Sequence, residues 1–186
     1  MNSSRLSKRA TSVAIASLFG AAILVSAPAF AGSTPANLTV TASVTANCTI
    51  STSAVAFGAY DPVSANASTD LNGNGSVSIA CTKGSAPNIT LDLGSNASGS
   101  QRNMKITGGG SDVLGYELYQ PPNTTPNTAC TFPGSQVWGT SGSAIFTPTA
   151  PASKTARTYR VCGTVAQGQD VSVGSYQDTV VATVNF

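Results

Sequence analysis

Hydrophobic and polar residues alternate strictly along residues 36–45. One set of alternate positions is apolar, and its members are Ala36, Leu38, Val40, Ala42 and Val44. The positions between them are Asn, Thr or Ser. A period of two predicts a strand with one dry and one wet face. This strand precedes every cysteine and contains no Gly or Pro, so it can pair within its own domain or be lent to a neighbouring molecule. The second use would make the chain a subunit of a fibre.

The same alternation returns at the end of the chain, over residues 176–186. One face of this strand carries Val180, Ala182, Val184 and Phe186. We expect these residues to belong to a core strand that runs to the last residue. Such a strand leaves no room for another after it, so any further strand that the sheet needs must come from elsewhere.

Between these two strands, short β-type runs recur between Gly, Pro and Asn residues, which is typical of an all-β sandwich. Besides 36–45 and 176–186, the predicted strands are 48–58, 75–82, 88–93, 103–107, 113–120, 143–147 and 157–166. The predicted turns and loops are 70–75, 108–110, 121–127 and 148–151.

The first 31 residues have the features of a secretory signal peptide: a basic start, an apolar stretch over 13–25 and the cleavage pattern Ala29-Phe30-Ala31. We expect the mature chain to begin at Gly32. The signal contains three of the nine Lys and Arg residues, so the remainder has six against seven Asp and Glu, a net charge near −1. No basic cluster remains there, and we expect no nucleic-acid partner.

All four cysteines lie in the exported part, where an even number indicates two disulfides. Three pairings are possible. We favour Cys48–Cys81 and Cys130–Cys162, because each joins sequence neighbours around a predicted strand pair. Loops of this size are worth about 3–4 kcal/mol each in the loop-entropy model.

Few residues suggest catalysis, metal binding or sugar binding. The chain has no histidine, and its carboxylates are scattered near predicted turns, so we predict no catalytic residues, no metal site, no cofactor and no enzymatic activity. Residues 70–75 match the first half of a calcium-binding loop, but the twelfth position is Cys81 instead of Glu, which favours a plain turn. Trp138 is interpreted as a core residue in preference to a sugar-stacking platform.

Several segments in order resemble the spore coat protein U domain family, which includes the Csu-type pilins of archaic chaperone–usher systems. The segments are Asn47-Cys48-Thr49-Ile50, Phe57-Gly58-Ala59-Tyr60-Asp61-Pro62, Val77-Ser78-Ile79-Ala80-Cys81, Leu114-Gly115-Tyr116-Glu117-Leu118-Tyr119, Val137-Trp138-Gly139 and Gly174-Ser175-Tyr176-Gln177-Asp178-Thr179-Val180. The resemblance extends over residues 36–186.

The resemblance implies an incomplete immunoglobulin-like β-sandwich that is completed by donor-strand exchange. In that scheme residues 32–47 are the donor strand and linker, and 48–186 the pilin domain. Leu38, Val40, Ala42 and Val44 would be donor residues, and Val180, Ala182, Val184 and Phe186 would line the acceptor groove. The implied partners are copies of the chain or related pilins, a periplasmic chaperone and an outer-membrane usher.

The sequence therefore predicts a secreted, non-enzymatic pilus subunit that passes through the periplasm to the cell surface and serves adhesion and biofilm formation. Two alternatives stay open. One is a coat or matrix protein whose N-terminal strand completes its own sandwich. The other is a carbohydrate-binding module that uses Trp138 and Tyr119.

Overall fold

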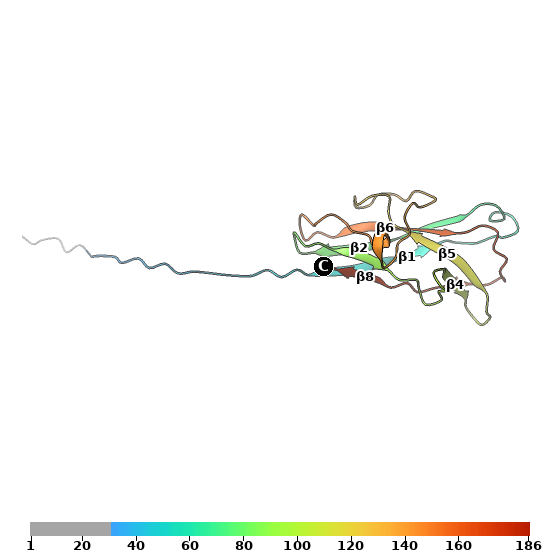
Figure 1. Cartoon of the computed structure of the whole chain (residues 1–186), viewed down its shortest axis with the longest axis horizontal. Helices are drawn as coiled ribbons and strands as arrows, with labels where there is room; N and C mark the ends of the chain where they lie inside the picture. Colours follow the sequence, from blue (N-terminus) through green and yellow to red (C-terminus); the bar gives the residue numbers. More distant parts are fainter. Residues whose placement is uncertain (1–30) are drawn as a thin grey trace, which may run out of the picture. The chain divides into compact units, whose positions relative to one another are not determined.

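A computed structural model of the chain describes residues 31–186 (Figure 1). The predicted signal peptide lies outside the described residues, except for Ala31. The chain divides into two units at Thr41. In the first unit, residues 31–41 have no regular secondary structure and their side chains are exposed. None of the helices within 31–186 has the length and apolarity needed to cross a membrane.

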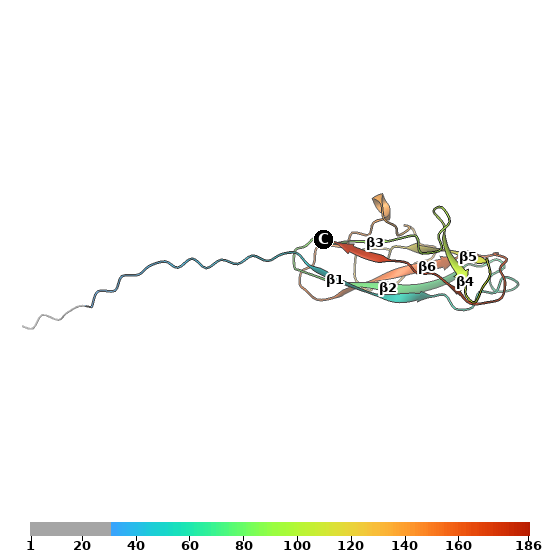
Figure 2. The ribbon, with the colours of Figure 1, turned by 90° about the horizontal axis from the view of Figure 1, so that it is seen from below.

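The second unit is built from strands, as the sequence predicts. They are β1 (Cys48–Ala56), β2 (Leu71–Cys81), β3 (Asn88–Leu91), β4 (Arg102–Ile106), β5 (Val113–Tyr119), β6 (Arg157–Val165), β7 (Tyr176–Gln177) and β8 (Ala182–Asn185), with one 3-10 turn, η1 (Gly142–Ala144). Six strands form a sheet in the order β1-β2-β6-β5-β4-β7, and β3 pairs with β8 in a second sheet (Figure 2). Every ladder in this part is antiparallel.

The core lies between the two sheets because alternate residues of each strand point inward. In β2 the odd positions from Val77 to Cys81 are buried, and in β5 the even positions from Leu114 to Leu118 are buried. Ile89 and Leu91 of β3 close the core from the other side. The sandwich is thus held together by two strand faces of period two, as the alternation predicts.

An aromatic cluster fills part of this core. The Phe146 ring lies 5.1 Å from the Trp138 ring and 5.0 Å from the Tyr159 ring, between ring centroids. Trp138 is fully buried, and its indole Nε1–H donates a hydrogen bond of 2.9 Å to the carbonyl oxygen of Ile89. Trp138 is therefore a core residue, and its ring is not accessible to a sugar.

A buried arginine joins the two sheets. Arg102 of β4 is fully buried and forms an ion pair with Glu117 of β5. Its guanidinium also donates hydrogen bonds to the carbonyl oxygens of Leu91, Asp92 and Trp138, at 3.3, 2.7 and 2.6 Å. These bonds satisfy a charge that would be costly to bury alone.

Two disulfides join strands and loops, Cys48–Cys81 and Cys130–Cys162, which are the pairings favoured from the sequence. Cys48 and Cys81 lie directly opposite each other in the β1–β2 ladder, with their Cα atoms 4.1 Å apart. This bond fixes the first residue of β1 to the last residue of β2.

Three glycines make a platform beneath the end of β1. Gly73 and Gly75 lie in β2 and Gly163 in β6, with Gly73 and Gly163 paired across the ladder. A Cβ atom added to Gly163 would lie 2.7 Å from the Phe57 ring and 2.8 Å from the Val55 side chain. The side chains of Val55 and Phe57 therefore rest directly on main chain, which no larger residue would allow.

Four predictions of local structure are wrong. Residues 36–45 form no strand in the single chain, because a strand needs a hydrogen-bonded partner. The predicted turn at 70–75 is instead the start of β2, where Leu71–Gly75 pair with β6. Residues 143–147 form part of η1 and a single bridge from Phe146 to Ile89.

The fourth is the strand at 176–186, which is two strands in different sheets. Carboxylates interrupt it: Asp178 accepts hydrogen bonds from Asn96, and Asp92 accepts one from the main-chain N–H of Val181 at 2.9 Å. The chain therefore leaves β4 after β7 and crosses to β3, where it forms β8.

Candidate functional site

A cavity of about 370 Å³ lies between β1 and β8. Its floor is made of core side chains, including Val77, Leu91 and Leu118. One wall is the second half of β1, over 52–55, and the other is the segment 176–182 that leads into β8. Core side chains thus line a cavity between β1 of one sheet and β8 of the other.

The β8 wall has an unpaired main-chain edge. In an antiparallel pair, successive residues turn their N–H and C=O groups alternately toward and away from the partner strand. The carbonyl oxygens of Thr179 and Val181 accept hydrogen bonds from Ser95 and Asp92, both at 3.1 Å, so the odd-numbered residues face the β3 side. The main-chain groups of Ala182 and Val184 therefore point to the open side.

The β1 wall has the same property. The carbonyl oxygen of Asn47 accepts a hydrogen bond of 2.9 Å from Thr82, so the odd-numbered residues of β1 face β2. By the same alternation, Ile50 and Thr52 direct their main-chain groups away from β2. Within residues 31–186, no strand pairs with either open edge. The site is a groove with an apolar floor and a hydrogen-bonding edge on each side.

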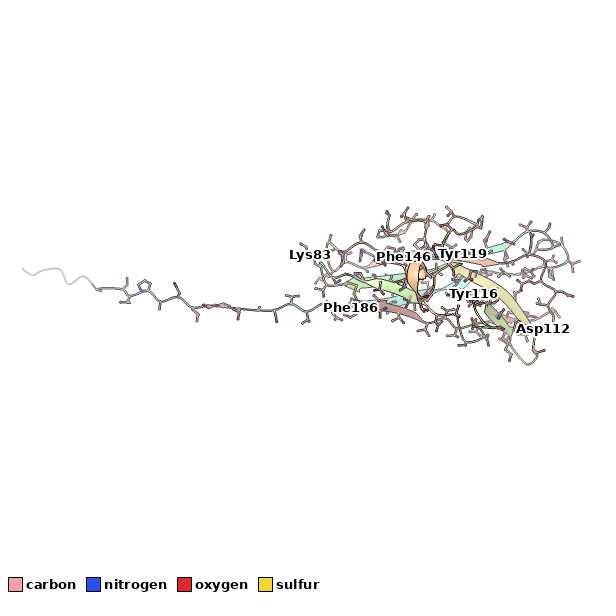
Figure 3. All side chains as sticks on the ribbon, in the orientation of Figure 1. Lys83, Asp112, Tyr116, Tyr119, Phe146 and Phe186 are labelled. Carbon is pink, nitrogen blue, oxygen red and sulfur yellow. A yellow bond between two sulfur atoms is a disulfide. The ribbon has the colours of Figure 1, made fainter. Side chains whose placement is uncertain are left out.

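β1 and β8 run in opposite directions. Figure 2 shows the C-terminus beside the start of β1, and the two strands are in contact. The groove therefore extends from Thr52 and Ala182 toward Phe57, the residue that follows β1. Phe186 follows β8 and is 54 % exposed (Figure 3).

A second cavity, of about 630 Å³, continues the groove beyond Phe57. It lies between the loop that follows β1, residues 57–62, and the loop that precedes β7, residues 171–175. Tyr60 positions the first loop, because its hydroxyl donates to the carbonyl oxygen of Ala166 at 2.9 Å and accepts from the N–H of Gln169 at 2.8 Å.

The β8 wall is positioned by a tyrosine–aspartate contact. The Tyr116 hydroxyl donates a hydrogen bond of 2.7 Å to Asp178. Burial raises the pKa of Tyr116, and the hydrogen bond and the negative charge of Asp178 raise it further. Tyr116 is therefore a neutral donor at any physiological pH.

The structure places the sequence-predicted acceptor residues as follows. Val180 and Ala182 line the first cavity, and Val184 is half-buried against the core on the same side. Sequence reasoning missed the opposite wall, made by Thr52, Val55 and Phe57, and the contributions of Met104 and Tyr176. Only the Phe57-Gly58 step of the family resemblance pointed there.

The predicted donor residues have their apolar side chains uncovered. Leu38 is 88 % exposed, Val40 85 % and Val44 84 %, and Ala42 is exposed as well. A row of exposed aliphatic side chains on one face of an extended segment is a surface that favours burial against another apolar surface.

The residues considered for other chemistry lie elsewhere. Asp70, the first residue of the calcium-like pattern, accepts a hydrogen bond from Gln167 N–H at 3.0 Å, and the residues after it are in β2. Among residues 31–186, no three His, Cys, Asp or Glu side chains form a group that could hold a metal ion.

Comparison with known families agrees with this architecture. The family model described as Spore Coat Protein U domain matches residues 34–183. The chain belongs to this family. The family assignment made from the sequence motifs is thus confirmed. Protein U of Myxococcus xanthus is 38 % identical over 191 residues, which are 95 % of this chain and 99 % of that protein.

Among solved structures, one chain of the CsuC–CsuE chaperone–tip adhesion subunit pre-assembly complex, from archaic chaperone–usher Csu pili of Acinetobacter baumannii, is similar with a TM-score of 0.50 and 24 % identity. The match covers 77 % of this chain and only 40 % of that one. The E. coli Hda pilus minor tip subunit, HdaB, aligns less well, with a TM-score of 0.35, 16 % identity and 74 % and 79 % coverage. The likeness to the Csu complex confirms the fold, an all-β immunoglobulin-like sandwich.

Proposed function

We propose that this spore coat protein U domain is a structural subunit of a secreted chaperone–usher pilus, and that it polymerises by donor-strand exchange in surface adhesion and biofilm formation. Its partners are copies of itself or related pilins, a periplasmic chaperone and an outer-membrane usher. The chain crosses the periplasm and ends at the cell surface. The role is mechanical and uses no cofactor or catalytic residue.

The open groove between β1 and β8 is the observation that carries this proposal. A strand placed in it finds apolar floor residues such as Leu91 and Leu118 and two main-chain edges. Exposed strand edges and exposed core surface are both unfavourable in water, which gives the groove a strong preference for being filled. The alternating segment 36–45 has the pattern that such a strand requires.

The direction of insertion follows from the position of the chain's own N-terminal segment. Because β1 and β8 run in opposite directions, a strand between them is parallel to one and antiparallel to the other. We take the donor strand to be parallel to β1 and antiparallel to β8. The donating domain then lies beyond the Phe57 end of the groove. The opposite direction would place that domain at the Asn47 end, where the receiving chain's own segment leaves β1. The first arrangement extends a fibre from subunit to subunit.

Burial of apolar side chains and main-chain hydrogen bonding both favour insertion of the segment. Burying Leu38, Val40 and Val44 contributes about 1.5–3 kcal/mol each. Main-chain hydrogen bonds to both edges add about 0.5–1.5 kcal/mol each. Ordering the segment costs about 1–2 kcal/mol per residue and offsets much of this gain.

Val40→Asp tests the donor assignment, with Thr41→Asp as the matched control on the other face. Each variant is co-expressed with its chaperone and usher, and fibre length is measured by electron microscopy. We expect Val40→Asp to be exported and to bind chaperone but to form no fibres, because a carboxylate enters the apolar floor. Thr41→Asp should form fibres. Normal fibres from Val40→Asp would refute the assignment.

A second function has one observation in its favour, the full-length similarity to Protein U within a family described by a spore coat domain. In that case the segment 36–45 fills the groove of its own domain and the protein is a coat or matrix component. Light scattering of the purified mature chain without chaperone separates the two. A stable monomer supports the coat protein, and rods or aggregates support the pilus subunit. The carbohydrate-binding alternative loses its basis, because Trp138 is buried.

A further inference from the structure

The groove has a constriction between its two cavities. Both cavities are lined by the same four residues, and these are Val55, Phe57, Met104 and Tyr176. All four are partly buried and pack against the core. They come from β1 and the residue after it, from β4 and from β7, so both sides of the groove contribute to the narrowing.

The constriction has little freedom to widen. The Phe57 ring lies edge-on to the Tyr116 ring, with centroids 6.1 Å apart. Beneath it are Gly73 and Gly163, whose main chain is so close that a Cβ atom at either position would lie 2.9 or 2.7 Å from the ring. Because Phe57 cannot sink further, the space at the constriction is limited from below.

The length of the first cavity sets which donor residue meets the constriction. On its β8 side the first cavity is lined from Ala182 back to Tyr176, a span of six residue steps. A donor strand that pairs along this span presents one side chain of a given face for every two steps, so three of them precede the one that lies beside Tyr176. A donor strand parallel to β1 supplies them in the order Ala36, Leu38 and Val40.

The next residue on that face is Ala42, and the one after it is Val44. We propose that Ala42 sets the register of the junction: its methyl group lies at the constriction, with Leu38 and Val40 in the first cavity and Val44 in the second. This inference rests on the proposed function. A strand inserted in the reverse direction would bring Leu38 to the constriction, so the small residue at position 42 also selects the direction.

The test compares neighbouring residues on the two faces of the donor segment. Ala42→Leu is expected to lower polymer formation about tenfold or more, because a larger side chain does not fit the constriction. Ser43→Leu places the same side chain on the opposite face, away from the groove, and polymer formation should stay within about twofold of the unchanged chain. Both positions are exposed in the subunit, so neither change affects its folding. Fibre yield with chaperone and usher is the readout.

A compensating change strengthens the test. Met104→Ala in the receiving subunit widens the constriction and should restore most of the fibre yield of Ala42→Leu. Equal yields from Ala42→Leu and the unchanged chain would overturn the register, and so would equal losses from Ala42→Leu and Ser43→Leu, or failure of Met104→Ala to restore the yield. The proposed function fails separately, if Val40→Asp and Thr41→Asp behave alike or the unchanged chain forms no fibres.

Discussion

Tyr116 and Asp178 are joined by a hydrogen bond of 2.7 Å that connects the central strand β5 to the segment between β7 and β8. Tyr116 also contributes to the groove floor, and Asp178 to its wall. The bond links this wall to the central strand, in addition to the hydrogen bonds that Asn96 donates to Asp178.

Tyr116→Phe should therefore lower both the stability of the domain and its capacity as an acceptor. We expect a loss of about 1–3 kcal/mol in the free energy of unfolding, since the half-buried acceptor Asp178 loses one partner. Denaturant unfolding measures this loss. Tyr119→Phe is the matched control, because no hydrogen bond is found for its hydroxyl, and it should change the free energy by less than about 0.5 kcal/mol. Equal effects of the two variants would contradict the role of the bond.

The raised pKa of Tyr116 predicts a loss of stability in alkali. In the unfolded chain the phenol titrates at its ordinary value of 10.0, whereas the folded domain keeps the proton to higher pH. The contribution of the protonated Tyr116 phenol to the free energy of unfolding is thus complete below pH 10 and is lost as the pH rises above 10. The free energy of unfolding, measured from about pH 9 to about pH 11, should fall less steeply for Tyr116→Phe than for the unchanged chain. Parallel curves would contradict this.

The two disulfides close loops of nearly equal length, with sequence separations of 33 and 32 between their cysteines. Replacing either pair by alanine should cost a similar free energy of unfolding, about 3–4 kcal/mol in the loop-entropy model. Fibre formation should respond differently. Loss of Cys48–Cys81 releases the start of β1, the strand whose second half is a wall of the groove, whereas Cys130–Cys162 includes no residue of β1 or β8. Fibre yield at a temperature where both variants stay folded measures the difference, and equal yields would contradict it.

The buried Arg102 should be among the most sensitive residues of the domain. Arg102→Ala leaves Glu117 without its counter-ion and three carbonyl oxygens without donors, and we expect a loss of about 3–5 kcal/mol. Lys105→Ala in the same strand is the control, because Lys105 is exposed. Thermal or denaturant unfolding gives both values. A loss below about 1 kcal/mol for Arg102→Ala would mean that the ion pair is replaceable.

Alternation of apolar and polar residues was enough to predict several of the strands that have a partner in the same chain. β5 and β6 were predicted to within one residue at each end, because their inward faces are continuous. The strand expected at 36–45 was wrong for a different reason. The pattern shows that a segment can be a strand, but not whether its main-chain groups find a partner in the same molecule.

Only part of the groove lining was predicted from the sequence. Val180 and Ala182 were identified from their alternation, whereas Met104 and Tyr176 come together only through the order of the strands in the sheet. The Asn-Gly steps at residues 72–75 indicated a turn, since they favour positive φ. In the structure Gly73 and Gly75 are needed for a different property, the missing side chain beneath Val55 and Phe57.

The glycine platform of Gly73, Gly75 and Gly163 determines how far the Phe57 side chain projects into the groove. A single methyl group at Gly163 would touch no incoming strand, yet it would lift the Phe57 ring toward the passage above it. In the proposed polymerisation, the next molecule would then fail to bind because of a change inside the receiving one, whose groove edges and N-terminal segment 36–45 are unchanged. The absence of a side chain at this buried position is therefore a requirement for assembly of the proposed fibre.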